Sequence, residues 1–181
     1  MSQGKDAVPA KPAFATDAVH LLRTTQQIQY QLSQMADQKA SMLLGITFVI
    51  FTITVGQVKN GSPQPALLVL GAAAFMAAFL TIMAVLPSVK SPPLSGKTDN
   101  ILFFGSFTQM PQADYVEMLM EVMAEPRQVY ETFARDIYQN GRVLALKKYR
   151  LLGYAYRVLL TGLVLSLIAF VAPYAAKALG H

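Results

Sequence analysis

Three long runs of mostly apolar residues, none of which contains a charged side chain, set the strongest limit on how this chain can fold. They lie between Lys39 and Lys59, between Lys59 and Lys90, and between Arg157 and Lys177. A helix needs about 20 mostly apolar residues to cross the ~30 Å hydrocarbon core of a bilayer. Because 54% of the residues are hydrophobic and only 14% are charged, too little polar surface remains for a soluble domain. The sequence therefore predicts an integral membrane protein with three transmembrane helices.

Turn-forming residues mark where the spans begin and end. Gly61, Pro63 and Pro65 indicate a turn between the first two runs, and Pro87 closes the second. The charge-free runs contain no Asp, Glu, Lys, Arg or His, so a proton-coupled transporter is not expected. The three spans are expected at residues 41–58, 66–87 and 156–176.

The distribution of basic residues predicts the orientation of these spans. Four of them lie in residues 1–40, one is Lys59, nine lie in residues 90–157, and one is Lys177. Cytoplasmic segments of membrane proteins carry the excess of Lys and Arg. A cytoplasmic N-terminus and a periplasmic C-terminus place 13 of the 15 basic residues inside, whereas the reverse topology places those 13 outside.

The polar parts of the chain are expected to be helical extensions of the spans. The pattern becomes helical at Asp17 and nothing breaks it before the first span, while Pro111 and Pro126 suit the first turns of two further helices. In chain order we expect a disordered N-terminus at 1–16, a cytoplasmic helix at 17–40, and a cytoplasmic head at 90–155 with a loop at 90–110 and helices at 111–124 and 126–155. The predicted fold class is all-α: an integral membrane helical bundle whose helical cytoplasmic head is formed by extensions of the first and third spans.

The cytoplasmic helix has an apolar seam and an amide-rich polar face. Seam residues recur at spacings of 4, 3, 4 and 3, as expected when a helix packs along a partner; they are Leu21, Thr25, Ile28, Leu32 and Met35. The polar face includes Gln27, Tyr30 and Gln34, and its many hydrogen-bonding groups leave two readings open. It is either a solvated surface or a place where a ligand binds.

Small residues recur in all three spans at spacings that let helix backbones approach closely. They are Ser41 and Gly45 in the first span, Gly71, Ala74 and Ala78 in the second, and Gly162 and Ser166 in the third. Such faces serve either to pack the three helices within one chain or to join protomers.

A stripe of basic and aromatic residues follows one face of the last long helix. Its members are separated by steps of 3, 4, 7 and 7; they are Arg135, Tyr138, Arg142, Tyr149 and Tyr156. Guanidinium groups bind phosphate bidentately and aromatic rings stack on bases, so the stripe is a candidate site for a nucleotide phosphodiester. The alternative is that these amphipathic side chains pack on neighbouring helices with their polar tips in water.

The apolar run Ile101–Phe107 is too short to span a membrane. We expect it to cover the top of the helical head, with contact to a ligand as the alternative. Gly105 in its middle would allow a bend with a positive φ that turns the phenylalanines inward.

Several kinds of chemistry are not expected. The chain has no cysteine, and its two histidines, His20 and His181, are too far apart in sequence to suggest a metal site. It has no Gly-rich phosphate loop and no nucleophile–base motif, and acids such as Glu117 and Asp136 are interpreted as helix-surface charges. We therefore expect neither an enzyme nor a bound cofactor or metal.

Four segments, taken in order, resemble the transmembrane Pycsar effector family (PycTM). They are residues 36–41 (ADQKAS), residues 100–107 (NILFFGSF), residues 135–138 (RDIY), and residues 148–157 (KYRLLGYAYR). The resemblance covers about residues 20–175. It implies a bacterial anti-phage effector in the inner membrane. The resemblance further implies that a companion cyclase makes cyclic CMP or cyclic UMP on infection. The effector would then impair the inner membrane and kill the cell before phage spread.

The resemblance implies the lipid bilayer and a cyclic pyrimidine nucleotide (cCMP or cUMP) as partners but names no contact residues. We also expect a homo-oligomer and no nucleic-acid polymer as a partner. Because no β-roll pattern is present, a nucleotide would have to bind among helices. The candidates are the stripe at Arg135, Tyr138, Arg142 and Tyr149, or the polar face at Gln27, Tyr30 and Gln34. The alternative function is a constitutive small membrane interaction or regulatory subunit whose head binds another protein.

The orientation can be tested with topology reporters. A reporter fused after His181 should be periplasmic, and one inserted near Lys97 should be cytoplasmic, because basic segments stay inside. Paired alkaline phosphatase and green fluorescent protein fusions measure this directly. Two reporters on the same side of the membrane would contradict a three-span chain.

Overall fold

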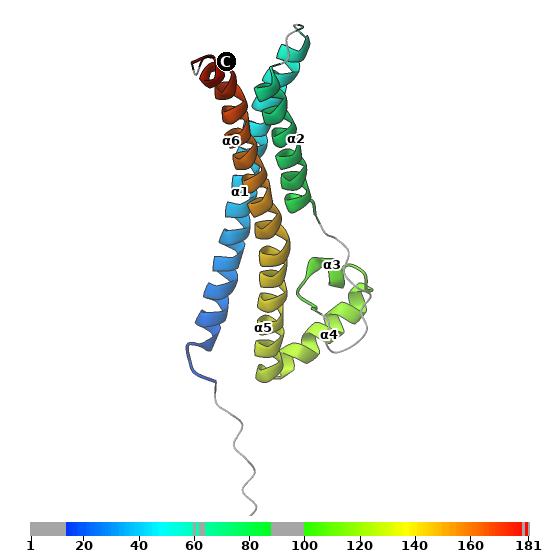
Figure 1. Cartoon of the computed structure of the whole chain (residues 1–181). Coiled ribbons are helices and arrows are strands. Elements are labelled where there is room, and N and C mark those ends of the chain that lie inside the picture. The colour runs from blue at the N-terminus through cyan, green and yellow to red at the C-terminus, as the bar shows by residue number, and fades with distance from the viewer. Residues whose placement is uncertain (1–13, 60, 62–63, 88–99, 179, 181) are drawn as a thin grey trace, which may run out of the picture.

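The computed structural model shows three long helices lying side by side, with a smaller helical part beside one end (Figure 1). It describes residues 14–59, 61, 64–87, 100–178 and 180. The expected N-terminal disorder at 1–16 and the expected loop at 90–110 therefore lie partly outside the described residues. Within the described part, every regular element is helical, which confirms the all-α class.

Each charge-free run is represented by a long helix, and the helices of the first and third runs begin well before these runs. They are α1 (Ala18–Lys59), α2 (Pro65–Val85), α3 (Phe104–Phe107), α4 (Gln112–Ala124), α5 (Pro126–Val143), a π-helical segment η1 (Leu144–Tyr149) and α6 (Arg150–Ala178). The helix α1, the helix α2 and the continuous run α5–η1–α6 are each long and apolar enough to cross a membrane. This confirms the prediction of three helices able to span a membrane, whereas the bounds of the spans stay a prediction. Helix α6 continues past Pro173 to its last residue, Ala178.

The ends of the long helices lie at two opposite ends of the bundle. The turn from α1 to α2 and the C-terminus lie at one end of the bundle, and the corner between α4 and α5 lies at the other (Figure 1). Pro126 begins α5 directly after Glu125, where its missing N–H costs no helical hydrogen bond. The head therefore adjoins the N-terminal half of α1 and the first part of the third long helix.

Close packing between α1 and the third long helix is concentrated where the polar and apolar parts of the chain meet. Ala40 and Leu43 of α1 are buried there against Leu152 and Ala155 of α6. The small side chains of the two alanines let the helices approach closely. Nearer the N-terminal end of α1, the Tyr149 hydroxyl donates to the carbonyl oxygen of Leu32 at 3.1 Å. This contact joins η1 to the backbone of α1.

The small residues of the spans pack inside the chain. Gly71 and Gly162 are buried: a Cβ added at Gly71 would press on the Thr54 side chain, and one added at Gly162 would collide with the Cβ of Ala73. The Ser166 hydroxyl donates to the carbonyl oxygen of Ala66 at 2.7 Å. These contacts favour intramolecular packing over a face that joins protomers for the second and third spans.

Three buried threonines show how polar side chains are accommodated in the spans. The hydroxyls of Thr47, Thr54 and Thr81 each donate to the carbonyl oxygen four residues earlier on their own helix, at 2.9, 2.9 and 2.7 Å. In a hydrocarbon environment, burial of a hydroxyl group without a hydrogen bond would cost on the order of several kcal/mol of free energy, as for other unsatisfied polar groups. The threonines therefore fill space between helices without requiring a partner helix for their hydrogen bonds.

The apolar seam of the cytoplasmic half of α1 does not face the rest of the chain. Leu21 is 69% exposed and Ile28 is 50% exposed, and Leu32 and Met35 are exposed as well. The helix instead contacts α5 through its amide-bearing face, where Gln29 donates to the carbonyl oxygen of Ile137. The expectation of packing along this seam is wrong within the chain, because the contacts of this half of α1 with α5 are made by the polar side chains of Gln26 and Gln29.

The internal role of Gly162 can be tested by adding a single methyl group. Gly162→Ala should destabilise the fold by about 1–3 kcal/mol, since the new methyl group collides with Ala73 and the helices must separate. Gly45→Ala is the matched control, because it lies in the first span and a Cβ there meets nothing within 4 Å. Thermal unfolding in detergent, followed by circular dichroism, measures both. An equal melting temperature for both variants would contradict this packing.

Candidate functional site

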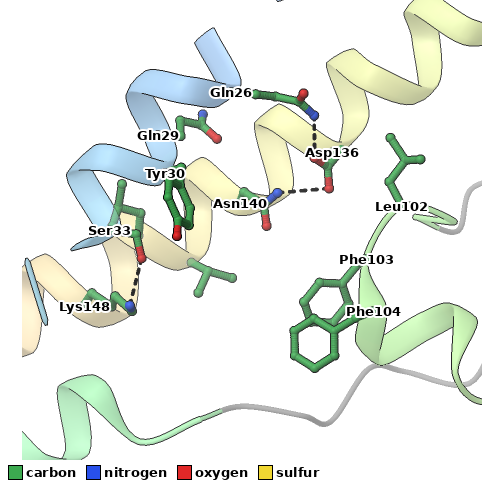
Figure 2. Close-up of a pocket in the computed structure, with 12 residues that line it drawn as sticks. Gln26, Gln29, Tyr30, Ser33, Leu102, Phe103, Phe104, Asp136, Asn140 and Lys148 are labelled. Atoms are coloured by element: carbon green, nitrogen blue, oxygen red, sulfur yellow. Dashed lines mark hydrogen bonds between the residues drawn. The ribbon is translucent and has the colours of Figure 1, made fainter. Parts of the chain in front are cut away.

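A cavity of about 570 Å³ lies in the head, between α1, α5 and the segment that leads into α3. Its volume falls within the range of roughly 300–1,000 Å³ that is typical of small-molecule sites. The side chains around it are a mixture of amide, aromatic, aliphatic and charged groups (Figure 2). The lining residues are Gln26, Gln29, Tyr30, Ser33, Leu102, Phe103, Phe104, Asp136, Asn140, Val143, Leu144 and Lys148.

At one end of the cavity, Asp136 is buried beneath three amide groups. Its carboxylate accepts hydrogen bonds from Asn100 Nδ2 at 2.8 Å, Asn140 Nδ2 at 3.0 Å and Gln26 Nε2 at 3.0 Å. The residue is only 7% exposed, so its interpretation as a helix-surface charge was wrong. A buried carboxylate is stable only when its lone pairs are satisfied, and donors from three separate segments provide this.

The Asp136 carboxylate also determines which way the neighbouring amides point. An ionised carboxylate only accepts hydrogen bonds, so Asn140 and Gln26 must present their nitrogen atoms to it and their oxygen atoms elsewhere. Figure 2 shows the Asn140 oxygen directed away from Asp136. The Gln29 amide is oriented in a similar way, because its nitrogen donates to the carbonyl oxygen of Ile137 at 2.9 Å. Asn140 and Gln29 therefore contribute amide oxygens, which are acceptors, to this part of the cavity.

At the other end, Lys148 is held by α1. Its Nζ atom lies 2.8 Å from both carboxylate oxygens of Asp37 and 2.8 Å from the Ser33 hydroxyl. Among the described residues that line the larger cavity, Lys148 is the one cation. The Asp37 side chain is about half exposed and the Lys148 side chain is largely covered. An anion in the cavity would therefore meet one positive charge with a single, partly hydrated counterion.

The π-helical segment η1 places two consecutive lysines on different neighbours. Lys148 reaches α1, whereas Lys147 Nζ donates to the carbonyl oxygen of Leu86 at 2.7 Å, directly after the end of α2. A π-helical turn inserts an extra residue into a helix, and such turns occur frequently at functional sites. The segment thus connects the third long helix to both of the other spans at the level of the cavity.

Aromatic rings form part of the cavity wall. Phe103 and Phe104 lie with ring centroids 4.9 Å apart, and Tyr30 projects from α1. The Asn100 side chain accepts a hydrogen bond from the Leu102 backbone N–H at 3.0 Å and so shapes the turn before Phe103. Gly105 is helical rather than in the expected positive-φ bend. The Phe103 ring covers Gly105 so closely that a Cβ would overlap it.

A second cavity of about 450 Å³ adjoins the first and shares several of its residues, including Phe103, Phe104 and Lys148. It extends to the end of α2, where Val85, Leu86 and Pro87 line it. The aromatic pair therefore contacts both spaces. A ligand in this region would touch residues that adjoin each of the three long helices.

Only one of the residues predicted to bind a ligand lines either described cavity. Tyr30 lines the larger one, whereas Gln27 and Gln34 are exposed on another face of α1. Of the stripe, Tyr138 and Arg142 are exposed, Arg135 is half-buried, and Tyr149 contacts the α1 backbone. Binding by the stripe stays a prediction.

The residues that line the cavity were missed for a recognisable reason. Asp136, Asn140, Leu144 and Lys148 follow one another at steps of four on α5 and η1, so they share one face. Polar residues at regular steps of four on this helix were the signal available in the sequence. The described residues contain no group of three or more His, Asp or Glu side chains placed to hold a metal ion.

Comparison with known proteins gives one match. The model of the family described as the Pycsar effector protein domain matches residues 20–173, which include every residue that lines the two cavities. This confirms the resemblance noted in the sequence. No curated protein and no solved structure matches the chain.

The role of Asp136 in holding the head together can be tested by removal of its carboxylate. Asp136→Ala should destabilise the protein by about 1–3 kcal/mol, because Asn100, Asn140 and Gln26 lose a shared acceptor. Hydrogen exchange should rise in the segment 100–107. Glu117→Ala, at an exposed position of α4, is the control and should change neither quantity. Unchanged protection of 100–107 in Asp136→Ala would show that the network does not order this segment.

Proposed function

The chain belongs to the Pycsar effector family, whose members are anti-phage transmembrane effectors, and we propose that its head senses a cyclic pyrimidine nucleotide, cCMP or cUMP. On binding, the protein impairs the bacterial inner membrane and causes abortive infection. The observation that supports this best is the head cavity, which combines aromatic rings, amide oxygens that face the cavity and one lysine. The rings can stack on a base, the amide oxygens can accept hydrogen bonds from its edge, and the lysine can bind the phosphate.

The phosphodiester of the ligand binds at Lys148 in this proposal. Lys148 and Asp136 lie at opposite ends of the row of side chains, which keeps the phosphate away from the buried carboxylate (Figure 2). The Lys148 ammonium contacts Ser33, one helical turn or about 6 Å along α1 from Gln29. A cyclic mononucleotide can span this distance, with its phosphate at Lys148 and its base near Gln29 and Asn140.

The base stacks on the aromatic wall and presents its edge to the amides. Tyr30, Phe103 and Phe104 supply faces for stacking, which is tolerant of base identity. The oxygens of Asn140 and Gln29 accept hydrogen bonds. The exocyclic amino group of cytosine has two N–H donors, whereas uracil has an acceptor oxygen at that position and donates from this edge only through its N3–H. The fixed orientation of the amides therefore favours cCMP over cUMP.

The ion pair between Lys148 and Asp37 offers a route from the cavity to the membrane. Asp37 lies one turn before the buried Ala40 and Leu43, where α1 packs on α6. A phosphate that binds Lys148 competes with Asp37 and weakens this connection between α1 and η1. A ligand shifts such an equilibrium only by its differential affinity for the two arrangements. Nucleotide binding thus favours a different packing of α1 against the third helix at the membrane boundary.

The binding step can be tested on the full chain in lipid nanodiscs. Titration calorimetry with cCMP, cUMP, cAMP and cGMP should show the tightest binding for cCMP, with cUMP weaker by about fivefold or more, as expected for one mismatched base-edge contact. Lys148→Met should lose binding, whereas Arg142→Met, at an exposed position of the stripe, should retain it. The opposite result for these two variants would move the site to the stripe. No binding of any of the four nucleotides would overturn the proposed ligand class.

The effector step can be tested in cells. Co-expression of the protein with a cyclase that makes its nucleotide should depolarise the inner membrane, as reported by a voltage-sensitive dye, and stop growth. Lys148→Met should prevent both effects while leaving the amount of protein in the membrane unchanged. Growth arrest without any cyclase would instead favour a constitutive membrane subunit that acts through another protein.

A further inference from the structure

The cytoplasmic half of α1 exposes an apolar seam that nothing in the described part of the chain covers. Leu21 is 69% exposed, Ile28 50% and Met35 46%. Exposed apolar area costs about 25 cal/mol per Å² relative to its burial, and contiguous patches of this kind usually mark interaction surfaces. The seam lies on a different face from Gln26, Gln29 and the cavity.

The same spacing can be followed along the membrane-spanning half of α1, but nearly every position there is apolar, so the repeat that defines the seam is the one in the cytoplasmic half. Steps of 3 and 4 alternate over the whole helix, and the seam positions are Leu21, Thr25, Ile28, Leu32, Met35, Lys39, Met42, Ile46, Val49 and Ile53. The four positions after Lys39 are exposed, as most of the earlier ones are. A mostly apolar repeat with a period of 3.5 residues is the pattern of a left-handed coiled coil of two or more helices.

We propose that this seam pairs with the same seam of a second copy of the chain, in parallel. The bilayer places every copy in the same orientation and at the same depth, so identical seams face each other in register. The polar positions beside the seam are uncharged, which avoids the like-charge repulsion that two parallel copies would otherwise have; they are Thr24, Gln31 and Gln38. Such an interface is isologous and closes as a dimer.

Lys39 is the one charged residue at a seam position. Its Nζ atom lies 6.0 Å from the centroid of the Tyr149 ring, on the side of η1. The charge is therefore turned toward its own chain rather than along the seam. A single lysine at a core position is also compatible with a coiled coil and helps to set its register.

The small-residue faces of the second and third spans could join two copies only if the helices within each chain separated first. Gly71, Ala74 and Gly162 are buried within the chain, and their neighbours leave no space for another helix. The apolar seam of α1 needs no such unpacking. Its residues are already exposed and already arranged for a helical partner of the same period.

The absence of cysteine makes disulfide cross-linking a direct test, and it needs no ligand. Single substitutions Ile28→Cys and Met35→Cys should give disulfide-linked dimers when membranes are oxidised, because core positions of a parallel pair face their own copies. Gln27→Cys and Gln34→Cys, on an exposed face away from the seam, are matched controls and should give several-fold less dimer. Equal cross-linking at all four positions, or none at the seam, would overturn the proposal.

A second measurement uses charge instead of cysteine. Ile28→Lys should convert the detergent-solubilised dimer to a monomer in native mass spectrometry, since two lysines would meet in an apolar interface. Gln27→Lys adds the same charge one residue away and should leave the dimer intact. Wild-type protein that is monomeric in both lipid nanodiscs and mild detergent, or an Ile28→Lys variant that remains dimeric, would refute pairing through this seam.

Discussion

The architecture of the head depends on one buried carboxylate, Asp136. Burial of a charge is costly unless all its lone pairs are satisfied, and here the donors come from α1, from α5 and from the segment before α3. Nothing in the local sequence of any of these segments requires it to lie next to the other two. Their shared hydrogen bonds to Asp136 hold α1 and α5 with polar rather than apolar surfaces toward each other, and this arrangement leaves a cavity between them.

That cavity acquires its connection to the membrane from the continuity of the third long helix. The run from Pro126 to Ala178 contributes Asp136 and Asn140 to the cavity and then continues as the third span. Midway, η1 directs Lys148 to α1 and Lys147 to the end of α2. Because this helix both lines the cavity and is long and apolar enough to cross the bilayer, the proposed binding could change its packing in the membrane without any hinge between domains. Through the two lysines, the same change would also reach the other two long helices.

The sequence predicts the spans reliably because length and absence of charge are local properties, but it does not predict which helix faces meet. Within the membrane nearly every position is apolar, so periodicity cannot distinguish Gly162, which is buried, from Gly45, which is exposed. In the head, the apolar seam of α1 was expected to be the packed face. The structure instead turns the polar face of α1 toward α5, because Gln26 on that face has to reach the Asp136 carboxylate. Pairing between Gln26 and Asp136 joins residues that are 110 positions apart, and no local pattern reveals it.

Helix α1 presents three different faces, and under the two proposals above these faces would link ligand binding to assembly. One face lines the cavity, one packs on α2 and α6 through residues such as Ala40, and the third is the exposed seam. A rigid helix cannot move one of these faces without moving the others. If a nucleotide strengthens pairing between copies by some factor, pairing must strengthen nucleotide binding by the same factor, because the two equilibria form a closed cycle. Pairing of the copies would then sharpen the response to the nucleotide, so that a membrane-damaging protein stays inactive at low ligand concentration and responds steeply when the concentration rises.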